Sequence, residues 1–112
     1  MLIDFTVIEE QICANMRGGE KEAGIKSFQD ECNKIMRGRL VPGGSIGLHT
    51  HEKNSETVYI LSGTGKFLYD GEYEPLAPGS CHYCPKGHAH SLINDGEEDL
   101  VFFAIVPEHE TN

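Results

Sequence analysis

Residues 43–63 read GGSIGLHTHEKNSETVYILSG, and the histidine and glutamate spacing in this stretch indicates a metal site. Side chains in a β-strand alternate between two faces, so His49 and His51 project to the same face and can reach one cation. Glu56 follows after a short polar connection and opens the next apolar segment. Two imidazoles and a carboxylate suit Mn, Fe, Ni, Zn or Cu. The alternative is that this stretch is a solvated polar turn. A further metal ligand from elsewhere in the chain would argue against that alternative.

From residue 34 onward the chain consists of short segments rich in Val, Ile, Phe and Tyr, separated by turn residues. These segments are KIMRGRLV (34–41), ETVYILS (56–62), GKFLYD (65–70), EYEPLA (72–77), SCHYCP (80–85), HSLIN (90–94) and DLVFFAIV (99–106). Asp70-Gly71 is a dipeptide favoured in two-residue hairpin turns, because both central residues there need positive φ. Short strands at regular spacing predict an all-β sandwich or barrel.

The first third of the chain has a different character. Residues 7–33 are rich in charged residues and show weaker apolar periodicity. A helical turn, an extended arm and an edge strand paired with another subunit all stay open for this part. We therefore expect residues 1–33 to form an N-terminal arm or edge segment of the same domain, and residues 34–112 to form the barrel.

A second stretch, GSCHYCPKGHAHSLIN (79–94), contains a fourth candidate ligand, His90. Its spacing is Gly-x5-Pro-x-Gly-x2-His-x3-Asn, and the first stretch reads Gly-x5-His-x-His-x4-Glu-x6-Gly. Together these two blocks resemble the two consensus motifs of the cupin superfamily, over nearly half of the chain. A single His-x-His is weak evidence, whereas ten matched positions in two ordered blocks are specific.

The resemblance implies a fold and a ligand set. The fold is a double-stranded β-helix, a jelly-roll barrel of two antiparallel sheets. In the family, the positions that match His49, His51, Glu56 and His90 ligate one metal ion inside the barrel, and all four are intact here. We therefore expect one divalent transition metal ion (Mn, Fe, Ni, Zn or Cu), whose identity the sequence does not determine.

The four cysteines, Cys13, Cys32, Cys81 and Cys84, are predicted to be small buried hydrophobic residues. Cys81 and Cys84 form a C-x-x-C pair, but in a strand their Cα atoms lie about 10 Å apart and their side chains point to opposite faces. A disulfide needs Cα atoms within about 7 Å, so this pair cannot form one. Both cysteines fall where the cupin pattern usually has aliphatic residues, and Ser80 stands where it commonly has Asp.

Alternation along the strands also predicts the walls of the site. If Glu56 and His90 point inward, residues at even spacing from them do so too. The inward residues predicted in this way are Val58, Ile60, Leu92 and either Phe102 or Phe103. His82 and His109 are assigned to the surface, and His88 is interpreted as exposed. Other polar candidates are interpreted as structural or exposed: Tyr59, Tyr69, Tyr73, Tyr83, Arg37 and Arg39.

Composition limits the class of partner and the location. The 112 residues carry a formal net charge of -9, with 18 acidic and 9 basic residues, which argues against nucleic acid or an anionic membrane as partner. No apolar run approaches the ~18 residues that span a bilayer. The N-terminus, MLIDFTVIEE, has acids within its apolar stretch and no basic region before it, so we expect a cytoplasmic protein.

Two functions are compatible with this site. The first is a metal-dependent enzyme that acts on a small oxygen-rich molecule, a carboxylate or sugar, as a decarboxylase, isomerase or dioxygenase. The second is a metal-containing module that binds or senses a small ligand without turnover. The fold alone does not select between them. A small jelly roll exposes sheet edges that need protection, so we also expect a homodimer.

Overall fold

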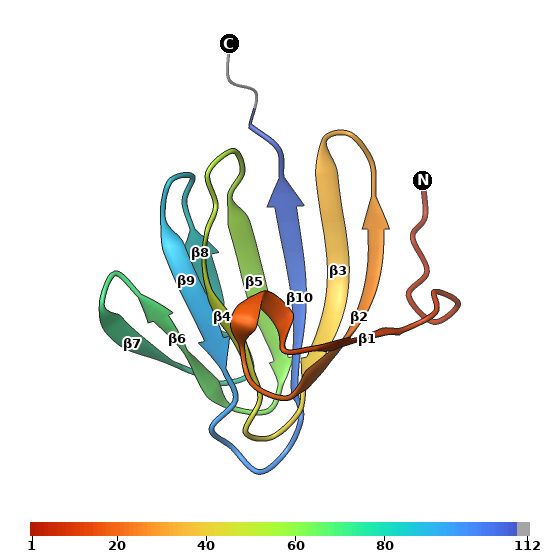
Figure 1. Cartoon of the computed structure of the whole chain (residues 1–112). Coiled ribbons are helices and arrows are strands. Elements are labelled where there is room, and N and C mark those ends of the chain that lie inside the picture. Colours follow the sequence, from red (N-terminus) through yellow and green to blue (C-terminus); the bar gives the residue numbers. More distant parts are fainter. Residues whose placement is uncertain (110–112) are drawn as a thin grey trace.

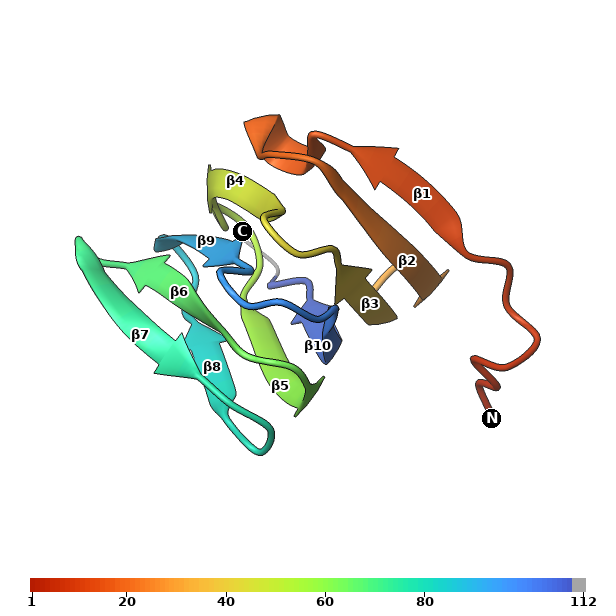
Figure 2. The same cartoon turned by 90° about the horizontal axis from the view of Figure 1, so that it is seen from below.

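The computed structural model describes residues 1–109, which form two antiparallel β-sheets facing each other (Figures 1 and 2). The larger sheet has the strand order β1 (Gln11–Ala14), β2 (Glu22–Gln29), β3 (Asn33–Leu40), β10 (Leu100–Pro107), β5 (Glu56–Ser62) and β8 (Cys81–Cys84). The smaller sheet has the order β4 (Ser45–Thr50), β9 (Ala89–Ile93), β6 (Gly65–Tyr69) and β7 (Glu72–Leu76). The predicted all-β architecture is confirmed. The last three residues of the segment expected to form the barrel lie outside the described residues.

Every apolar segment from residue 34 onward that was predicted to be a strand forms a strand. The stretch with the two histidines forms an additional strand, β4. The Asp70-Gly71 turn joins β6 to β7, with positive φ at both residues (49° and 77°) as a two-residue hairpin requires. Besides strands, the chain has a short 3-10 turn, η1 (Met16–Gly18), which lies in front of the two sheets in Figure 1. Within residues 1–109, no helix is long and apolar enough to cross a membrane.

The core lies between the two sheets and follows strand alternation. In β10, Leu100, Phe102 and two further alternate residues are buried, whereas Phe103 faces outward and is half-buried. The predicted inward residues Val58, Ile60, Leu92 and, of the two phenylalanines, Phe102 are all buried. Gly38 lies opposite Phe102 in the register, and a Cβ there would come within 2.3 Å of the Phe102 ring. The absence of a side chain at Gly38 therefore makes room for this phenylalanine.

The first third of the chain supplies extra strands to the larger sheet of the same molecule. β2 pairs with β3, and β1 pairs with β2 at the sheet edge. The residues before β1 run along the outer face of this sheet, where the rings of Phe5 and Phe103 make an edge-on contact at 6.0 Å. Arg39 donates two hydrogen bonds of 2.8 Å to the Glu10 carboxylate, which lowers the pKa of Glu10. The homodimer stays a prediction.

Candidate metal centre

The four residues predicted to bind metal come together between the sheets. His49 and His51 lie on β4, Glu56 begins β5 and His90 lies on β9. Each offers one ligand atom, and these atoms all lie within 4.8 Å of one another. The structure thus brings together side chains that are up to 41 residues apart in the sequence.

A β-bulge places His49 in this group. The pairing of β4 with β9 shifts register between Ile46 and His49, so that both side chains face the interior although they are three residues apart. Leu48, inside the bulge, is exposed. The Ile46 carbonyl accepts a hydrogen bond of 2.6 Å from Ser91 Oγ, which holds the bulge against β9.

The hydrogen bonds of the three histidines leave the same nitrogen of each ring facing the centre. His49 Nδ1 donates to the Gly47 carbonyl at 2.7 Å. His51 Nδ1 donates to Asn54 Oδ1 at 2.6 Å, because the Asn54 amide nitrogen donates to a different residue. His90 Nδ1 lies 3.0 Å from a buried histidine, His82. In the neutral rings Nδ1 therefore carries the proton, and Nε2 has a free lone pair for a metal ion.

The spacing of the donor atoms fits a transition metal ion. Nε2 of His51 lies 3.0 Å from Nε2 of His90, and the nearer Glu56 oxygen lies 3.2 and 2.9 Å from these two nitrogens. Two ligand atoms at right angles, each about 2.1 Å from an ion, are about 3.0 Å apart. Lone pairs that converge at this distance repel each other unless a positive ion or a proton lies between them. Imidazole and carboxylate donors suit Mn, Fe, Ni, Zn or Cu.

The electrostatics of the site keep its anionic ligand ionised. Burial alone would raise the pKa of Glu56, but without a metal ion the protonated rings of His51 and His90 supply hydrogen bonds and positive charge that outweigh burial and lower the pKa to about 2. The hydrogen bond to Glu56 raises the pKa of His51, whereas the nearby positive charge of Arg17 acts in the opposite direction. Burial lowers the pKa of His49 and favours its neutral, metal-binding form. Glu56 is therefore a carboxylate at any physiological pH, as a metal ligand needs to be.

His82 was expected at the surface, and this prediction is wrong. The residue is 3% exposed, because its position on β8 has the same parity as the buried Cys84. His82 Nδ1 donates to Glu74 Oε1 at 2.7 Å, which leaves His82 Nε2 to accept the proton of His90 Nδ1 at 3.0 Å. The Phe67 ring stacks on His82 with the centroids 3.7 Å apart. Glu74, His82 and His90 thus form a continuous chain that fixes the His90 ring and its tautomer.

Replacing His82 by alanine should weaken metal binding while leaving the four ligands in place. Loss of a partner that orients a ligand histidine typically costs about 10–100-fold in metal affinity. The measurement is competition of the purified protein with a chromophoric chelator. His88→Ala is the control, because His88 lies outside the cavity, half-exposed against the Tyr69 hydroxyl. Equal affinities for the two variants would contradict the orienting role of His82.

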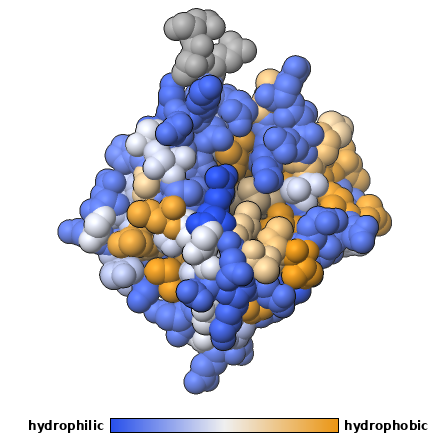
Figure 3. Space-filling model, viewed as in Figure 1, coloured by the Kyte–Doolittle hydropathy of each residue, from blue (hydrophilic) through white to orange (hydrophobic). Residues whose placement is uncertain are grey.

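The four ligand residues form one wall of a cavity of about 230 Å³ between the sheets. Apolar side chains form most of the remaining lining: Met16, Ile25, Met36, Ile46, Val58, Phe67, Leu92, Phe102 and Val106. The polar residues that complete it are Arg17, Gln29, Lys34, Asn54 and Glu108. Figure 3 shows apolar atoms in a hollow on the face seen in Figure 1, with hydrophilic side chains around it. Small ligand sites commonly have such apolar walls and a few polar anchors.

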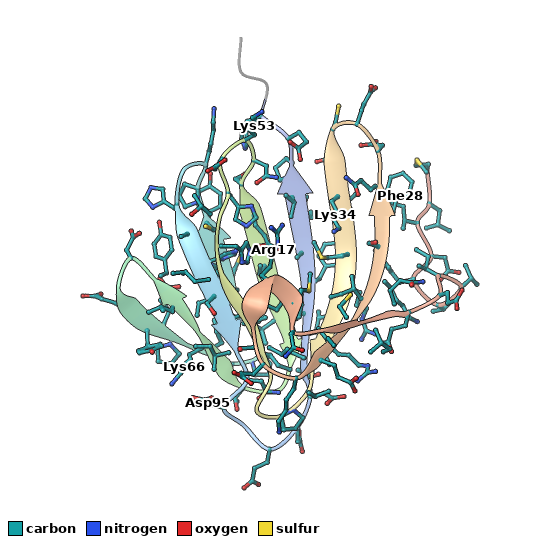
Figure 4. All side chains as sticks on the ribbon, viewed as in Figure 1. Arg17, Phe28, Lys34, Lys53, Lys66 and Asp95 are labelled. Atoms are coloured by element: carbon teal, nitrogen blue, oxygen red, sulfur yellow. The ribbon has the colours of Figure 1, made fainter. Side chains whose placement is uncertain are left out.

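Arg17 and Lys34 are functional candidates that sequence reasoning missed. Both line the cavity, Arg17 from η1 and Lys34 from β3, and Figure 4 labels both residues. Arg37 and Arg39, which the sequence analysis interpreted as structural or exposed, are so: Arg37 is exposed, Arg39 pairs with Glu10, and neither lines this cavity. The Arg17-Gly18-Gly19 sequence was the one available signal, because glycines mark a tight turn, but nothing local indicated that the turn faces the histidines.

The cysteine prediction holds for one residue of the four. Cys84 is buried, and burial together with nearby negative charge raises its pKa to about 11. Cys32 and Cys81 are exposed, so the prediction is wrong for them, whereas Cys13 is half-buried and packs against the core. Residues three apart on a strand face opposite ways, so Cys81 and Cys84 could not both be buried. All four cysteines are free.

Three remaining predictions concern exposed polar residues. His109 is exposed as expected, although its ring nitrogen lies 2.8 Å from Ser55 Oγ. Of the tyrosines, Tyr59, Tyr73 and Tyr83 are exposed, as expected. The Tyr69 hydroxyl contacts His88 at 3.1 Å, outside the cavity.

Comparison with known proteins identifies the class that this fold and site define. The model of the family described as "Cupin domain" matches residues 36–106. The chain therefore belongs to the cupin family. A solved structure from Thermotoga maritima, described as a predicted oxalate decarboxylase, has a TM-score of 0.90 and 32% identity, covering 96% of this chain and 99% of that one. The double-stranded β-helix expected from the sequence motifs is confirmed.

Two curated relatives differ in how much of their length is shared. The oxalate-binding protein of Thermotoga maritima is 33% identical over 112 residues, which is 95% of this chain and 93% of that protein. The glucose-6-phosphate isomerase of Thermococcus gammatolerans is 38% identical over 66 residues, or 53% of this chain and 35% of the isomerase. The chain thus shares nearly the full length of the first relative and about a third of the second.

Proposed function

We propose that this protein binds one divalent transition metal ion through His49, His51, Glu56 and His90, and through it a small carboxylate such as oxalate. The observation that carries the proposal is the convergence of three imidazole Nε2 atoms and one carboxylate on the wall of a cavity. The relative that is similar over 95% of the chain is an oxalate-binding protein, which supports the choice of ligand. When bound, the ion would supply a Lewis acid with open positions for carboxylate oxygens.

The residues around the site perform the other parts of this function. The hydrogen bonds that Nδ1 of each histidine donates hold the rings so that the site needs little rearrangement to accept an ion. The apolar walls, which include Met36 and Phe102, limit the water around a bound carboxylate and strengthen its attraction to positive charge. Binding therefore requires only side chains that already line the cavity.

Calorimetric titration with oxalate tests the proposal directly. Metal-loaded protein should bind one oxalate per chain, and protein stripped with a chelator should bind none at the same concentrations. Elemental analysis of the purified protein gives the identity and amount of the ion. Oxalate binding that is equally strong without metal would contradict the proposal, as would a metal-loaded protein that binds no oxalate.

Turnover of the bound carboxylate is a second candidate, favoured by the position of Glu108. This carboxylate lines the cavity and accepts a hydrogen bond of 3.2 Å from the Asn54 amide. Decarboxylation of hydrogen oxalate breaks the C–C bond, releases CO₂ and places a proton on the carbon of formate, and the Glu108 carboxylate could take the acidic proton of hydrogen oxalate and pass it to that carbon. Incubation with ¹³C-labelled oxalate separates the two candidates, because an enzyme produces formate whereas a binding protein leaves oxalate intact.

A further inference from the structure

Arg17 is held in an uncommon backbone conformation at the edge of the cavity. Its φ and ψ are 56° and 30°, in the left-handed region that residues other than glycine and asparagine rarely adopt. The Asn15 amide closes this turn with a hydrogen bond of 3.0 Å to the Gly19 carbonyl. Such a conformation costs about 1–3 kcal/mol and persists where the surroundings enforce it, commonly at functional sites.

The turn that carries Arg17 is fixed against the strand that carries two of the metal ligands. Glu20 and Ser45 are joined by two hydrogen bonds of 2.9 Å. A Cβ at Gly47 would lie 2.0 Å from the Arg17 carbonyl oxygen, so the two backbones meet where only glycine fits. The Gly47 carbonyl also accepts the His49 hydrogen bond. Arg17 and the His49 ring are therefore positioned by the same residue.

Arg17 and Lys34 are the two basic residues that line the cavity, whereas several basic residues elsewhere in residues 1–109 are already paired. Arg39 pairs with Glu10, Lys66 with Asp95, and two further lysines donate to backbone carbonyls. Within residues 1–109, neither Arg17 nor Lys34 makes a side-chain hydrogen bond or an ion pair, although both line the cavity. Two positive charges at the metal cavity are therefore available to a ligand.

The charges around the cavity favour a ligand with two negative charges. The formal charges of Arg17 and Lys34 balance those of Glu56 and Glu108, so the two positive charges of a bound divalent ion remain uncompensated. The chain as a whole has a net charge of -9, so it repels anions in general. The positive centre therefore attracts an anion only at this site. A dianion would neutralise the site, whereas a monoanion would leave one positive charge unpaired.

We propose that Arg17 and Lys34 form a second anchor of the site and select dicarboxylates over monocarboxylates. This proposal rests on the proposed function, in which one end of the ligand contacts the metal ion. The oxygens that face away from the ion would accept hydrogen bonds from the planar guanidinium of Arg17, whose fork matches a carboxylate. Lys34 adds a second positive charge from β3, and most of the remaining lining is apolar.

Oxalate and oxamate form a matched pair of probes, because they have nearly the same shape but carry two and one negative charges. Calorimetry on metal-loaded protein should show oxalate binding at least about ten-fold more tightly than oxamate. Arg17→Gln should weaken oxalate binding about 10–100-fold and remove most of the preference over oxamate. Metal content should not change, since Arg17 is not a ligand. Lys34→Gln should also weaken oxalate binding and reduce the preference over oxamate. It serves as the second variant, because Lys34 lies on β3 and Arg17 on η1.

Arg37→Gln is the matched control, because Arg37 lies on the same strand as Lys34 but is exposed and outside the cavity. This variant should keep the affinity and preference of the unmodified protein. Equal affinities for oxalate and oxamate in the unmodified protein, or a preference unchanged in both Arg17→Gln and Lys34→Gln, would overturn the second anchor and leave the metal–carboxylate proposal standing. If metal-loaded protein binds none of oxalate, malonate and succinate, both proposals fail.

Discussion

Metal bound to the purified protein should fall from about one equivalent per chain to background when His51 is replaced by alanine. His51 Nε2 lies 3.0 Å from His90 Nε2 and 3.2 Å from the Glu56 carboxylate, so it lies between the other donors. Its loss removes a ligand and leaves a gap that water would fill. Losing a residue that merely orients a ligand costs about 10–100-fold in metal affinity, so we expect more than 100-fold from losing the ligand itself.

Elemental analysis after dialysis against a weak chelator measures this change. His109→Ala is the control, since His109 is an exposed histidine outside the cavity and its variant should keep the full metal content. Glu56→Gln is a second test, because the amide keeps the shape of the side chain but removes its negative charge. Far-UV circular dichroism shows whether the sheets persist. Unchanged metal content in a folded His51→Ala protein would show that the ligand assignment is wrong.

The sequence predicted the ligand group through two motifs that resemble those of the cupin family, and strand alternation accounts for part of their spacing. Alternation along a strand places His49 and His51 on one face. It likewise places Val58 and Ile60 on the same face as Glu56. Those local rules hold wherever pairing is regular. The bulge between Ile46 and His49 is different, since it depends on how β4 pairs with β9, a strand more than 40 residues away. Local patterns therefore predict the ligands but not the backbone irregularity that positions them.

Residues that depend on contacts distant in sequence were missed or misplaced. His82 shares the parity of Cys84, so its burial could have been inferred once Cys84 was taken as buried. The position of Arg17 could not, because it depends on a close backbone approach between Gly47 and η1. Two glycines in a charged segment do not indicate which strand the turn will contact. The site thus divides into candidate ligands placed by strand periodicity and polar cavity residues placed by tertiary packing.

Phe67→Ala should destabilise the protein by about 3–5 kcal/mol, the range for removing a large aromatic side chain from a core. Phe67 is 2% exposed and lies between the sheets, with its ring stacked on His82 at 3.7 Å and on His90 at 5.1 Å. A domain of this size has a total stability of about 5–15 kcal/mol, so the loss is a large part of it. We expect the melting temperature to fall by about 10–20 °C.

Thermal and urea unfolding in the presence of a chelator measure the effect without a contribution from metal. Tyr73→Ala is the matched control on the adjacent strand, because Tyr73 is 59% exposed and contacts Lys66 with its ring. Its loss should cost less than about 1 kcal/mol. A similar loss for both variants would contradict a packing role for Phe67.

The same pair of variants can be measured again with saturating metal. An ion that binds only the folded chain adds about 2.7 kcal/mol of stability at 100 times its dissociation constant. In Phe67→Ala the rings of His82 and His90 lose the surface on which they stack, so the gain on adding metal should be smaller than in Tyr73→Ala. An equal gain in both would mean that hydrogen bonds alone position His90. A smaller gain in Phe67→Ala would show that core packing and metal affinity are coupled through this ring.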